Sequence, residues 1–529
     1  MLTYIFNIYF FFSILSCIFV YFIRNWKLLN FIILYSLIFS FFFSLFFFFI
    51  FENKLKISNF FLIFNFLNIK YFNFLFIWCL DSFSLIFVIL TTFILILSVL
   101  WSWNYSWNKK SLYIFFLFLD FLLKGCFFAF DIFTFFIFFE SILIVILYLI
   151  GILGTHERKV KAIYFFYVYT LLGSFLILLA LLIIYFEVGS SGLFILNNLN
   201  LTFKKQIFLW PLLSLSFLIK IPVFPFHLWL PEAHVEASTL GSVFLAAILL
   251  KLGGFGFLKF TIPLLPYASI YYTPLIEVLC CLGFFCCGFD ALRQIDFKKI
   301  VAYSSVVHMN LVVLAIFTNT LKGLLGAVLM MVAHGLTSAG MFFCLGALYD
   351  RYQTRNILYV KGLVHVMPLF CTLMFFFMLT NIGFPGSINF ISEILCFCGI
   401  LQYNFSYTII FLFGGLLVNT IYNFWFFNKV FFGTLKKKKT LSYYVWNVYK
   451  KKYIISPNYL KKLPVQYFFF IPFKNKLKIK PVTYQDITKR EFCTLFILSV
   501  WLIIWGIFPE KLINFCQIHL IYLNIRSLS

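Results

Sequence analysis

Four charged residues lie within stretches of the sequence that are otherwise apolar enough to cross a lipid bilayer. Glu140 occurs in IFTFFIFFESILIVILYLIG, and Glu393 occurs in FPGSINFISEILCF. Lys220 ends the run IFLWPLLSLSFLIK, and Lys251 lies inside FLAAILLKLGGFGFLKF. An ionised side chain at the centre of a bilayer costs about 3 kcal/mol on insertion scales, so each of these residues needs a reason to be there. Intramembrane acids and bases of this kind are typical of proton relays.

Two histidines add titratable groups to the same part of the sequence. His308 lies in VAYSSVVHMNLVVLAIF, and His334 lies in MVAHGLTSAG. A single histidine inside a membrane is often only a hydrogen-bonding core residue, so His334 alone does not indicate a relay. The alternative for the charged residues is a set of ion pairs that only hold helices together.

Two of the apolar runs contain helix-breaking residues beside their charges. Pro222 and Pro225 follow Lys220, and the stretch Gly383–Pro385–Gly386 precedes Glu393. Proline removes a backbone donor and frees a carbonyl, and such groups are tolerated at membrane depth only where they line a cavity or water. A lysine at a broken helix can therefore take up and release protons, which a simple membrane anchor does not need to do.

The composition predicts the class of protein that carries these residues. Of the 529 residues, 64% are hydrophobic and 11% are charged, and the mean hydropathy is +1.03. A soluble chain could not bury this much apolar surface, and the continuous apolar runs argue against a β-barrel. We expect an all-α polytopic membrane protein with about 14 transmembrane helices, near 3–23, 29–51, 83–103, 111–130, 131–150, 162–187, 207–226, 240–260, 272–290, 299–318, 323–348, 363–402, 407–430 and 492–508. The segment 57–80 contains several asparagines and is expected to be an ordered loop.

The charged residues repeat along the chain with a nearly constant separation. The step from Glu140 to His308 is close to the step from Lys220 to Glu393, and each step covers five expected helices. Because five is odd, the second copy lies upside down relative to the first, as in transporters with inverted repeats. The repeat is imperfect, because a step of the same length from Lys251 ends near Asn419 and Asn423, where no lysine occurs.

This repeat divides the chain into five expected regions. They are N-terminal helices 1–3 in 1–110 with an ordered loop at 52–80, a first inverted repeat (spans 4–8) forming a proton half-channel in 111–260, a second inverted repeat (spans 9–13) forming a half-channel in 261–433, a lysine-rich insertion in 434–490, and a final helix with the C-terminus in 491–529.

The basic residues indicate which way the helices cross the membrane. The formal net charge is +24, but the lysines and arginines gather in loops that follow odd-numbered spans, which argues against nucleic-acid binding. By the positive-inside rule these loops and the insertion face the cytoplasm or the matrix, and both termini face the other side. Lys124 and Lys259 are counted among the charges of that other side. The cysteines of CCLGFFCC at 280–287 lack histidine or acidic companions, and we expect no metal site there.

Several stretches closely resemble the NADH dehydrogenase (ubiquinone) subunit 4 family, the antiporter-like, proton-pumping membrane subunits of mitochondrial respiratory complex I. The resemblance lies in KIPVFPFHLWLPEAHVEASTLGSVFLAAILLKLGGFGFLKF (220–260), DFKKIVAYSSVVHMNLVV (296–313), MVAHGLTSAGMFFCLGALYDR (331–351) and GFPGSINFISEI (383–394). It covers roughly residues 75–430 and departs from the family at Ser238, where proline is usual. The insertion 434–490 and the first 75 residues are not covered.

The resemblance implies a role for each buried group. It makes Glu140 and Lys220 the ion pair of the input side, Lys251 the central relay, His308 its continuation and Glu393 the terminal residue. His227 and His334 would be auxiliary, and Pro222, Pro225 and Pro385 would mark the helix breaks. The stretch HLWLPEAHVEA would be a structural loop on the basic side, and its His227, Glu232, His234 and Glu236 are not expected to bind a metal.

The resemblance also implies the setting of the chain. It would be a multi-pass protein of the mitochondrial inner membrane that moves protons from matrix to intermembrane space, driven by quinone reduction elsewhere in the complex. NAD, FMN, iron–sulfur clusters and ubiquinone would belong to partner subunits, with the subunit 2 and subunit 5 homologues as neighbours and a phospholipid such as cardiolipin as a further candidate ligand. The alternatives are a subunit of an Mrp-type cation/proton antiporter and a structural membrane scaffold.

Overall fold

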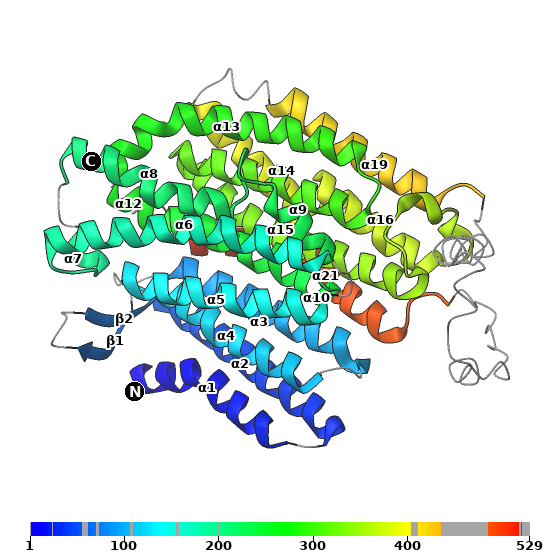
Figure 1. Cartoon of the computed structure of the whole chain (residues 1–529), viewed down its shortest axis with the longest axis horizontal. Coiled ribbons are helices and arrows are strands. Elements are labelled where there is room, and N and C mark those ends of the chain that lie inside the picture. The colour runs from blue at the N-terminus through cyan, green and yellow to red at the C-terminus, as the bar shows by residue number, and fades with distance from the viewer. Residues whose placement is uncertain are drawn as a thin grey trace, which may run out of the picture.

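The computed structural model describes residues 2–23, 25–54, 62–69, 74–105, 109–154, 158–197, 201–403, 411–434, 485–517 and 520. Long helices run in roughly the same direction and form a bundle (Figure 1). Their length and apolar composition suit a bilayer, because a spanning helix needs about 20 apolar residues. Eleven helices of the described chain meet both criteria by length and composition. The fold is therefore that of a polytopic helical membrane protein.

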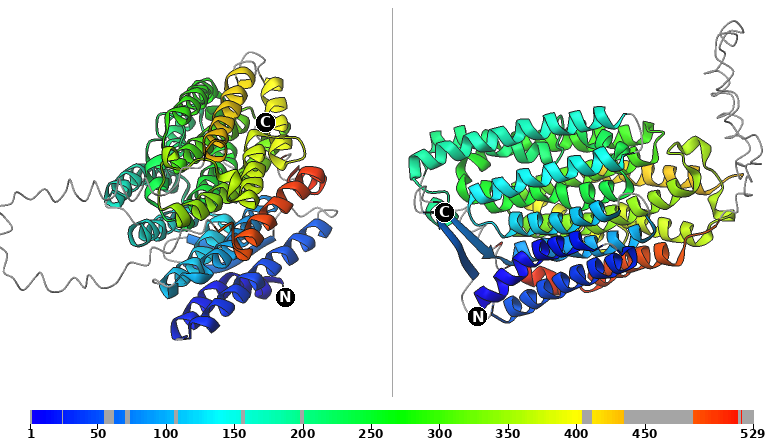
Figure 2. Two further views of the ribbon diagram at one scale, coloured as in Figure 1. Left: turned by 90° about the vertical axis from the view of Figure 1, so that its right-hand side faces the viewer. Right: turned by 60° about the horizontal axis from the view of Figure 1, so that its bottom comes forward.

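The N-terminal helices pack along one side of the bundle (Figure 2). They are α1 (Leu2–Phe22), α2 (Trp26–Lys54) and α3 (Ser82–Trp101), the last followed by the short helix η1 (Ser102–Asn104). Between α2 and α3 lies an antiparallel hairpin of β1 (Leu62–Ile69) and β2 (Phe74–Leu80), with Leu62 paired to Leu80. The segment expected to be an ordered loop is thus a β-hairpin in its described part. Its strands pair their own backbone groups, which is how chain outside a helix meets its hydrogen-bonding needs.

The next five expected spans each correspond to helices of the structure. They are α4 (Lys109–Phe128), α5 (Ile132–Leu153), α6 (Lys159–Val188), the broken pair α8 (Phe203–Lys220) and α9 (Trp229–Glu236), and a composite helix of α10 (Thr239–Phe244), η2 (Leu245–Leu249), α11 (Leu250–Gly256), η3 (Phe257–Thr261) and α12 (Ile262–Leu264). The short α7 (Leu193–Asn197) connects α6 to α8. The loop expected at HLWLPEAHVEA is instead largely the helix α9.

The following five spans repeat this order of elements. They are α13 (Pro266–Arg293), α14 (Phe297–Phe317), α15 (Leu321–Tyr352), the broken pair α16 (Pro368–Ile382) and α17 (Ile388–Tyr403), and η6 (Phe411–Leu416) continued by α19 (Leu417–Phe431). Short helices η4 (Ile357–Tyr359) and η5 (Leu363–His365) precede α16, and α21 (Lys489–Ile507) follows the insertion. The break falls in the fourth span of each set, as the sequence predicts. Residues 435–484 of the insertion lie outside the described residues.

The spans at the centre of the bundle are almost completely enclosed by protein. The windows of Thr239–Leu264 and Leu321–Tyr352 that meet the membrane criteria are 100% buried, whereas that of Lys159–Val188 is 33% buried. Apolar side chains alone would gain little from this burial, because lipid is as apolar as they are. The central spans are also those that carry Lys251 and His334. Their enclosure keeps these polar groups away from lipid.

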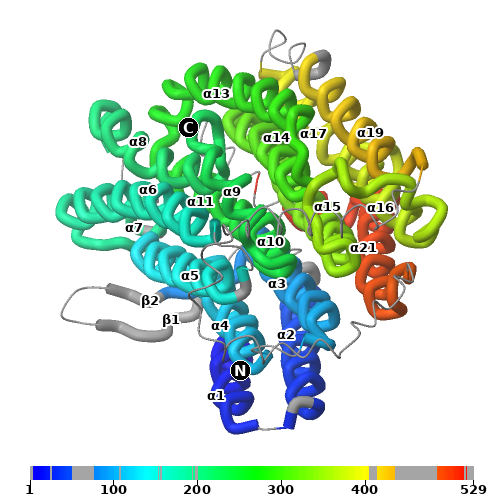
Figure 3. The backbone as a smooth tube through the Cα atoms, turned by 45° about the vertical axis from the view of Figure 1, so that its right-hand side comes forward, coloured from blue at the N-terminus to red at the C-terminus, as the bar shows by residue number. Residues whose placement is uncertain are grey.

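Helix α21 crosses the bundle beside the second broken helix (Figure 3). It packs against α3 on one side and against α15, α16 and α17 on the other. Gly506 makes this approach possible, since a Cβ atom there would collide with the backbone of Gly386 and Ser387 at the break. The last helix thus braces the point where α16 and α17 separate.

We expect Gly506→Val to weaken this packing. Overpacking a tight contact typically costs about 1–3 kcal/mol, and the variant should lower the thermal stability and the yield of the purified protein. Ile507→Val is the matched control, because Ile507 is 58% exposed on the same helix. Equal stability of the two variants would contradict the role given to Gly506.

Candidate functional site: a chain of buried ionisable groups

Helices α5 and α8 bring the first expected pair together. The Nζ atom of Lys220 lies 4.0 Å from Oε1 of Glu140 and 3.4 Å from the carbonyl oxygen of Phe139. Lys220 is 1% exposed, whereas the side chain of Glu140 is 29% exposed at the outer face of α5. The predicted pair is therefore formed, but only its lysine lies fully inside the bundle.

The helix is broken after Lys220, over residues 221–228, and backbone groups at this break find hydrogen-bond partners within it or beside it. The indole of Trp229 donates a hydrogen bond of 2.9 Å to the carbonyl of Ile219, which the end of α8 leaves free. The backbone N–H of Val223 donates to the carbonyl of Leu218 at 3.1 Å. His227 lies within this break, with its ring near those of Phe224 and Tyr303. The Pro222 and Pro225 break is thus a closed turn that ends α8 directly at the lysine.

Lys251 occupies the centre of the molecule and is 0% exposed. It lies on α11 between the two π-helical segments η2 and η3, and such segments are often found at functional sites. Its Nζ atom is 2.5 Å from the carbonyl oxygen of Ala246 in η2 and 2.8 Å from Nδ1 of His334 on α15. The amine is therefore held by one backbone oxygen and one imidazole nitrogen.

The contacts continue from His334 to the second broken helix. The rings of His334 and His308 have centroids 5.7 Å apart. His308 on α14 places Nε2 3.1 Å from Oδ1 of Asn381 and Nδ1 3.8 Å from Oε1 of Glu393. Lys251, His334, His308 and Glu393 thus lie next to one another in one row. His334, expected only as an auxiliary group, is the residue that joins Lys251 to His308.

The carboxylate of Glu393 lies against the second break. Gly383 has a φ of +83°, which favours glycine, and a Cβ atom there would collide with Oε2 of Glu393. Glu393 is on α17, after its break, whereas Lys220 is at the end of α8, before its break. The two residues expected to be counterparts therefore occupy opposite sides of their helix breaks, although both lie beside one.

A cluster of amides extends the site toward α19. Asn381 donates from Nδ2 to Oδ1 of Asn423 at 3.2 Å, and Asn419 donates from Nδ2 to the carbonyl of Asn381 at 3.0 Å. Asn423 and Tyr422 both donate to the side-chain oxygen of Asn419. These residues stand where the repeat would place a counterpart of Lys251. Where the repeat predicts a counterpart of Lys251, the second half thus has an uncharged polar cluster, and this cluster contacts His308 through Asn381.

Two further buried ion pairs correct the charge assignment made from the sequence. Lys124 and Asp120 of α4 are 2.5 Å apart, and Lys259 of η3 is 2.8 Å from Asp81 before α3. All four side chains are at most 4% exposed, so Lys124 and Lys259 are not loop charges at a membrane surface. The spacing of Asp120 and Lys124 on one helix face could have identified the first pair, whereas the second joins distant segments and has no local signal.

His234 on α9 was named in the sequence but given no role in the relay. It is 0% exposed, its ring stacks on Phe342 of α15, and neither ring nitrogen has a hydrogen-bond partner among the described residues. The neighbouring acids are paired, with Glu232 2.8 Å from Lys299 and Glu236 3.6 Å from Arg355. Buried polar atoms nearly always have partners, so water is the expected partner of His234.

Comparison with known proteins identifies the class of protein to which this fold belongs. The family described as "NADH:quinone oxidoreductase/Mrp antiporter, TM" matches residues 129–418. The structure is similar to a chain of respiratory complex I from Thermus thermophilus with bound NADH, with a TM-score of 0.80, 22% identity, and coverage of 98% of this chain and 99% of that one. It is also similar to a chain of the Mrp complex from Dietzia sp. DQ12-45-1b, with a TM-score of 0.79, 14% identity and 97% coverage of both chains. The protein is thus an antiporter-like membrane subunit.

The curated relatives give the more specific assignment. The chain is 41% identical over 464 residues to NADH-ubiquinone oxidoreductase chain 4 of Chondrus crispus, covering 88% of this chain and 85% of the relative. It is 46% identical over 359 residues to the protein of the same name from Arabidopsis thaliana, covering 68% and 72%. The chain belongs to the NADH-ubiquinone oxidoreductase chain 4 family. It is therefore a multi-pass membrane subunit of complex I, and this assignment is favoured over an Mrp-type antiporter.

The contact between Lys251 and His334 makes a testable prediction. We expect His334→Leu to leave the buried amine with a single partner, which costs about 1–3 kcal/mol and lowers the thermal stability of the purified complex. His334→Gln keeps a hydrogen-bond acceptor and should lie close to the wild type. His365→Gln is the surface control. A leucine variant as stable as the wild type would show that the contact contributes nothing to the fold.

Proposed function

We propose that this chain carries protons across the membrane along Glu140, Lys220, Lys251, His334, His308 and Glu393. The observation that carries the proposal is the row of neighbouring titratable groups from Lys251 through both histidines to Glu393, with 2.8 Å between Lys251 and His334, 5.7 Å between the two ring centroids and 3.8 Å between His308 and Glu393. Side chains that only fasten helices could pair off separately. A continuous series of titratable groups supports stepwise proton transfer.

Glu140 is the proposed entry group. Its side chain is partly exposed on the outer face of α5, and a carboxylate in that position would be costly against lipid. A neighbouring membrane-arm subunit covering this face would relieve that cost, and the subunit 2 and subunit 5 homologues are the proposed partners on either side. Oxidation of NADH and reduction of quinone, with their FMN and iron–sulfur clusters, belong to other subunits, and this chain performs no redox chemistry.

Apolar side chains separate the entry pair from the central lysine. A Cβ atom at Gly253, two residues from Lys251, would meet the side chain of Ile221 and the carbonyl of Phe217. Proton passage between Lys220 and Lys251 therefore requires water to enter this packing, in the way that hydrophobic constrictions gate other pores. His234 on α9 has buried ring nitrogens without partners in the described chain and is the proposed water position on this route, whereas Asn389 on α17, likewise without partners there, is a proposed water position in the second half.

Glu393 is the proposed exit group. By the positive-inside rule we assign the side of the basic loops and of the insertion to the matrix, and the side of the termini to the intermembrane space. The entry half then comprises residues 111–260 and the exit half residues 261–433. Protons enter from the matrix through the first half and leave through the second, in the mitochondrial inner membrane.

We expect Glu140→Gln to impair pumping while the complex still assembles. Removing the carboxylate leaves Lys220 without its anion. The pumping rate should fall about tenfold, which corresponds to about 1.4 kcal/mol of activation free energy. The measurement is proton uptake coupled to NADH oxidation in vesicles, with assembly followed on native gels. Glu187→Gln is the matched control, because Glu187 pairs with Lys205 on the surface at 3.1 Å. Normal pumping by Glu140→Gln would reduce the pair to a structural role.

We expect Glu393 to change its protonation during turnover. Among the described residues its ion-pair partner is His308, so Glu393 should be protonated when the relay is empty and ionised when a proton reaches the histidines. Infrared difference spectra of the active complex should contain a protonated-carboxyl band that changes with turnover and is lost in Glu393→Gln. A variant that pumps at the normal rate would remove Glu393 from the path, and the absence of such a band from the difference spectra would indicate a residue that stays ionised throughout turnover.

A further inference from the structure

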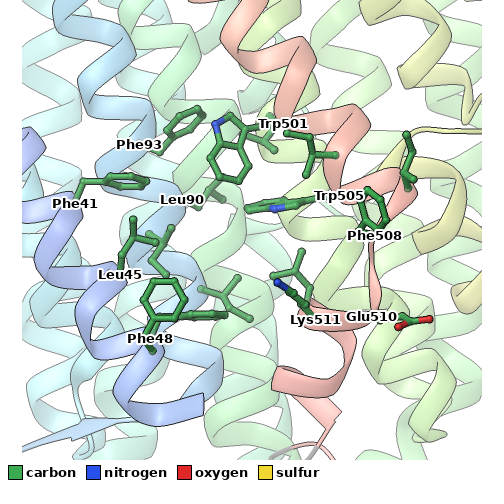
Figure 4. Close-up of a pocket in the computed structure, with 17 residues that line it drawn as sticks. Phe41, Leu45, Phe48, Leu90, Phe93, Trp501, Trp505, Phe508, Glu510 and Lys511 are labelled. Carbon is green, nitrogen blue, oxygen red and sulfur yellow. The ribbon is translucent and has the colours of Figure 1, made fainter. Parts of the chain in front are cut away.

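A cavity of about 820 Å³ lies on the opposite side of α15 from the His334–Lys251 contact. Its walls come from the second half of α2, the first half of α3, and the end of α21 with the residues that follow it (Figure 4). Leu336 of α15 forms its inner wall. The cavity lies toward the end of the bundle where the β1–β2 hairpin connects α2 to α3 (Figure 1).

The lining of this cavity is apolar except at one edge. Aromatic rings surround it, including those of Phe41, Phe48, Phe93, Trp501 and Trp505. The charged groups of the lining are Lys511 and Glu510, directly after α21. Figure 4 shows the Lys511 side chain among the rings of α2 and α21, whereas Glu510 points away from them. Within the described chain Lys511 has no ion-pair partner.

We propose that this cavity binds one zwitterionic glycerophospholipid of the adjacent leaflet. The acyl chains lie among the aromatic rings, the phosphate accepts hydrogen bonds from Lys511, and the headgroup ammonium faces Glu510. Tryptophan is enriched where spanning helices meet the headgroup region, which agrees with Trp505 near the charged edge. A lysine beside a glutamate suits a headgroup that carries both charges better than the two phosphates of cardiolipin.

The size of the cavity favours a lipid over a helix of a neighbouring subunit. Small-molecule sites have volumes of roughly 300–1,000 Å³, and 820 Å³ lies within that range. A spanning helix is about 30 Å long and about 10 Å wide, which is several times larger. An apolar helix would also leave Lys511 without an anion.

The inner wall links the lipid to the relay. Leu336 is two residues from His334 on α15, and Leu90 of α3 lies 3.0 Å from the position a Cβ would take at Gly335. An acyl chain in the cavity therefore covers α15 directly behind the His334–Lys251 contact. Its presence keeps water out of this side of the relay, and its removal should increase passive proton leak.

Photolabelling of the intact complex tests the site. Phosphatidylethanolamine with a diazirine in its acyl chain is incorporated into vesicles with the purified complex, and labelled peptides are mapped after irradiation. We expect labels on α2 near Phe41–Phe49 and on α21 near Trp501–Phe508. Leu45→Trp fills the cavity and should abolish this labelling, whereas Phe42→Trp, 63% exposed on the same helix, should not change it. Equal labelling of the two variants would overturn the proposal.

The charged edge is tested separately. The attraction between one basic residue and an anionic lipid group at a membrane surface corresponds to a roughly fivefold change in how often the lipid occupies the site. Lys511→Gln should therefore reduce labelling about fivefold. Unlabelled phosphatidylethanolamine should compete better than cardiolipin. Unchanged labelling in Lys511→Gln, stronger competition by cardiolipin, or density for a neighbouring subunit's helix in the cavity would each contradict the proposed ligand.

Discussion

The buried amine of Lys251 sets the conditions that the surrounding helices have to meet. An ammonium group in a dry interior is tolerated only with hydrogen-bond acceptors close to it. Its acceptors are the carbonyl of Ala246 on its own helix and the ring of His334 on another. The enclosure of α11 and α15 by the rest of the bundle follows from this need, because either helix at the lipid surface would expose the pair.

Interrupted helices supply the polar backbone that buried charges require. In a regular helix each carbonyl is used by the N–H four residues later, so a spanning helix offers little to a side chain. The π-helical segment η2 changes this pairing next to Lys251, and the breaks after α8 and α16 do so beside Lys220 and Glu393. Each interruption weakens its helix locally. Contacts such as Trp229 to Ile219, and α21 against Gly386, compensate for that loss.

Local signals in the sequence predicted the spans, both breaks and the identity of the charged residues, because apolar length, proline and intramembrane charge are properties of short segments. The sequence did not predict contacts between segments that lie far apart along the chain. His334 and Lys251 are 83 residues apart, and nothing in either segment specifies that their side chains meet at 2.8 Å. The pairing of Lys259 with Asp81 was missed for the same reason. The hairpin at 62–80 was missed because its asparagines interrupt the strand pattern as well as the helical one.

The balance of charge along the proposed path would allow its two halves to differ in chemistry. The first half carries the pair Glu140 and Lys220, while the second carries Glu393 and, in place of a lysine, the cluster around Asn419. With Lys251 at the centre, the path contains two acids and two amines, so its net charge is zero when all four are ionised and again when all four are neutral. An uncompensated charge is costly in a low-dielectric interior. A proton that neutralises Glu393 therefore favours the loss of one from a lysine, although no contact joins Lys220 to Glu393. Coupling between the halves then needs no movement of whole helices, because each group responds to the charge of the others through the apolar medium that surrounds them.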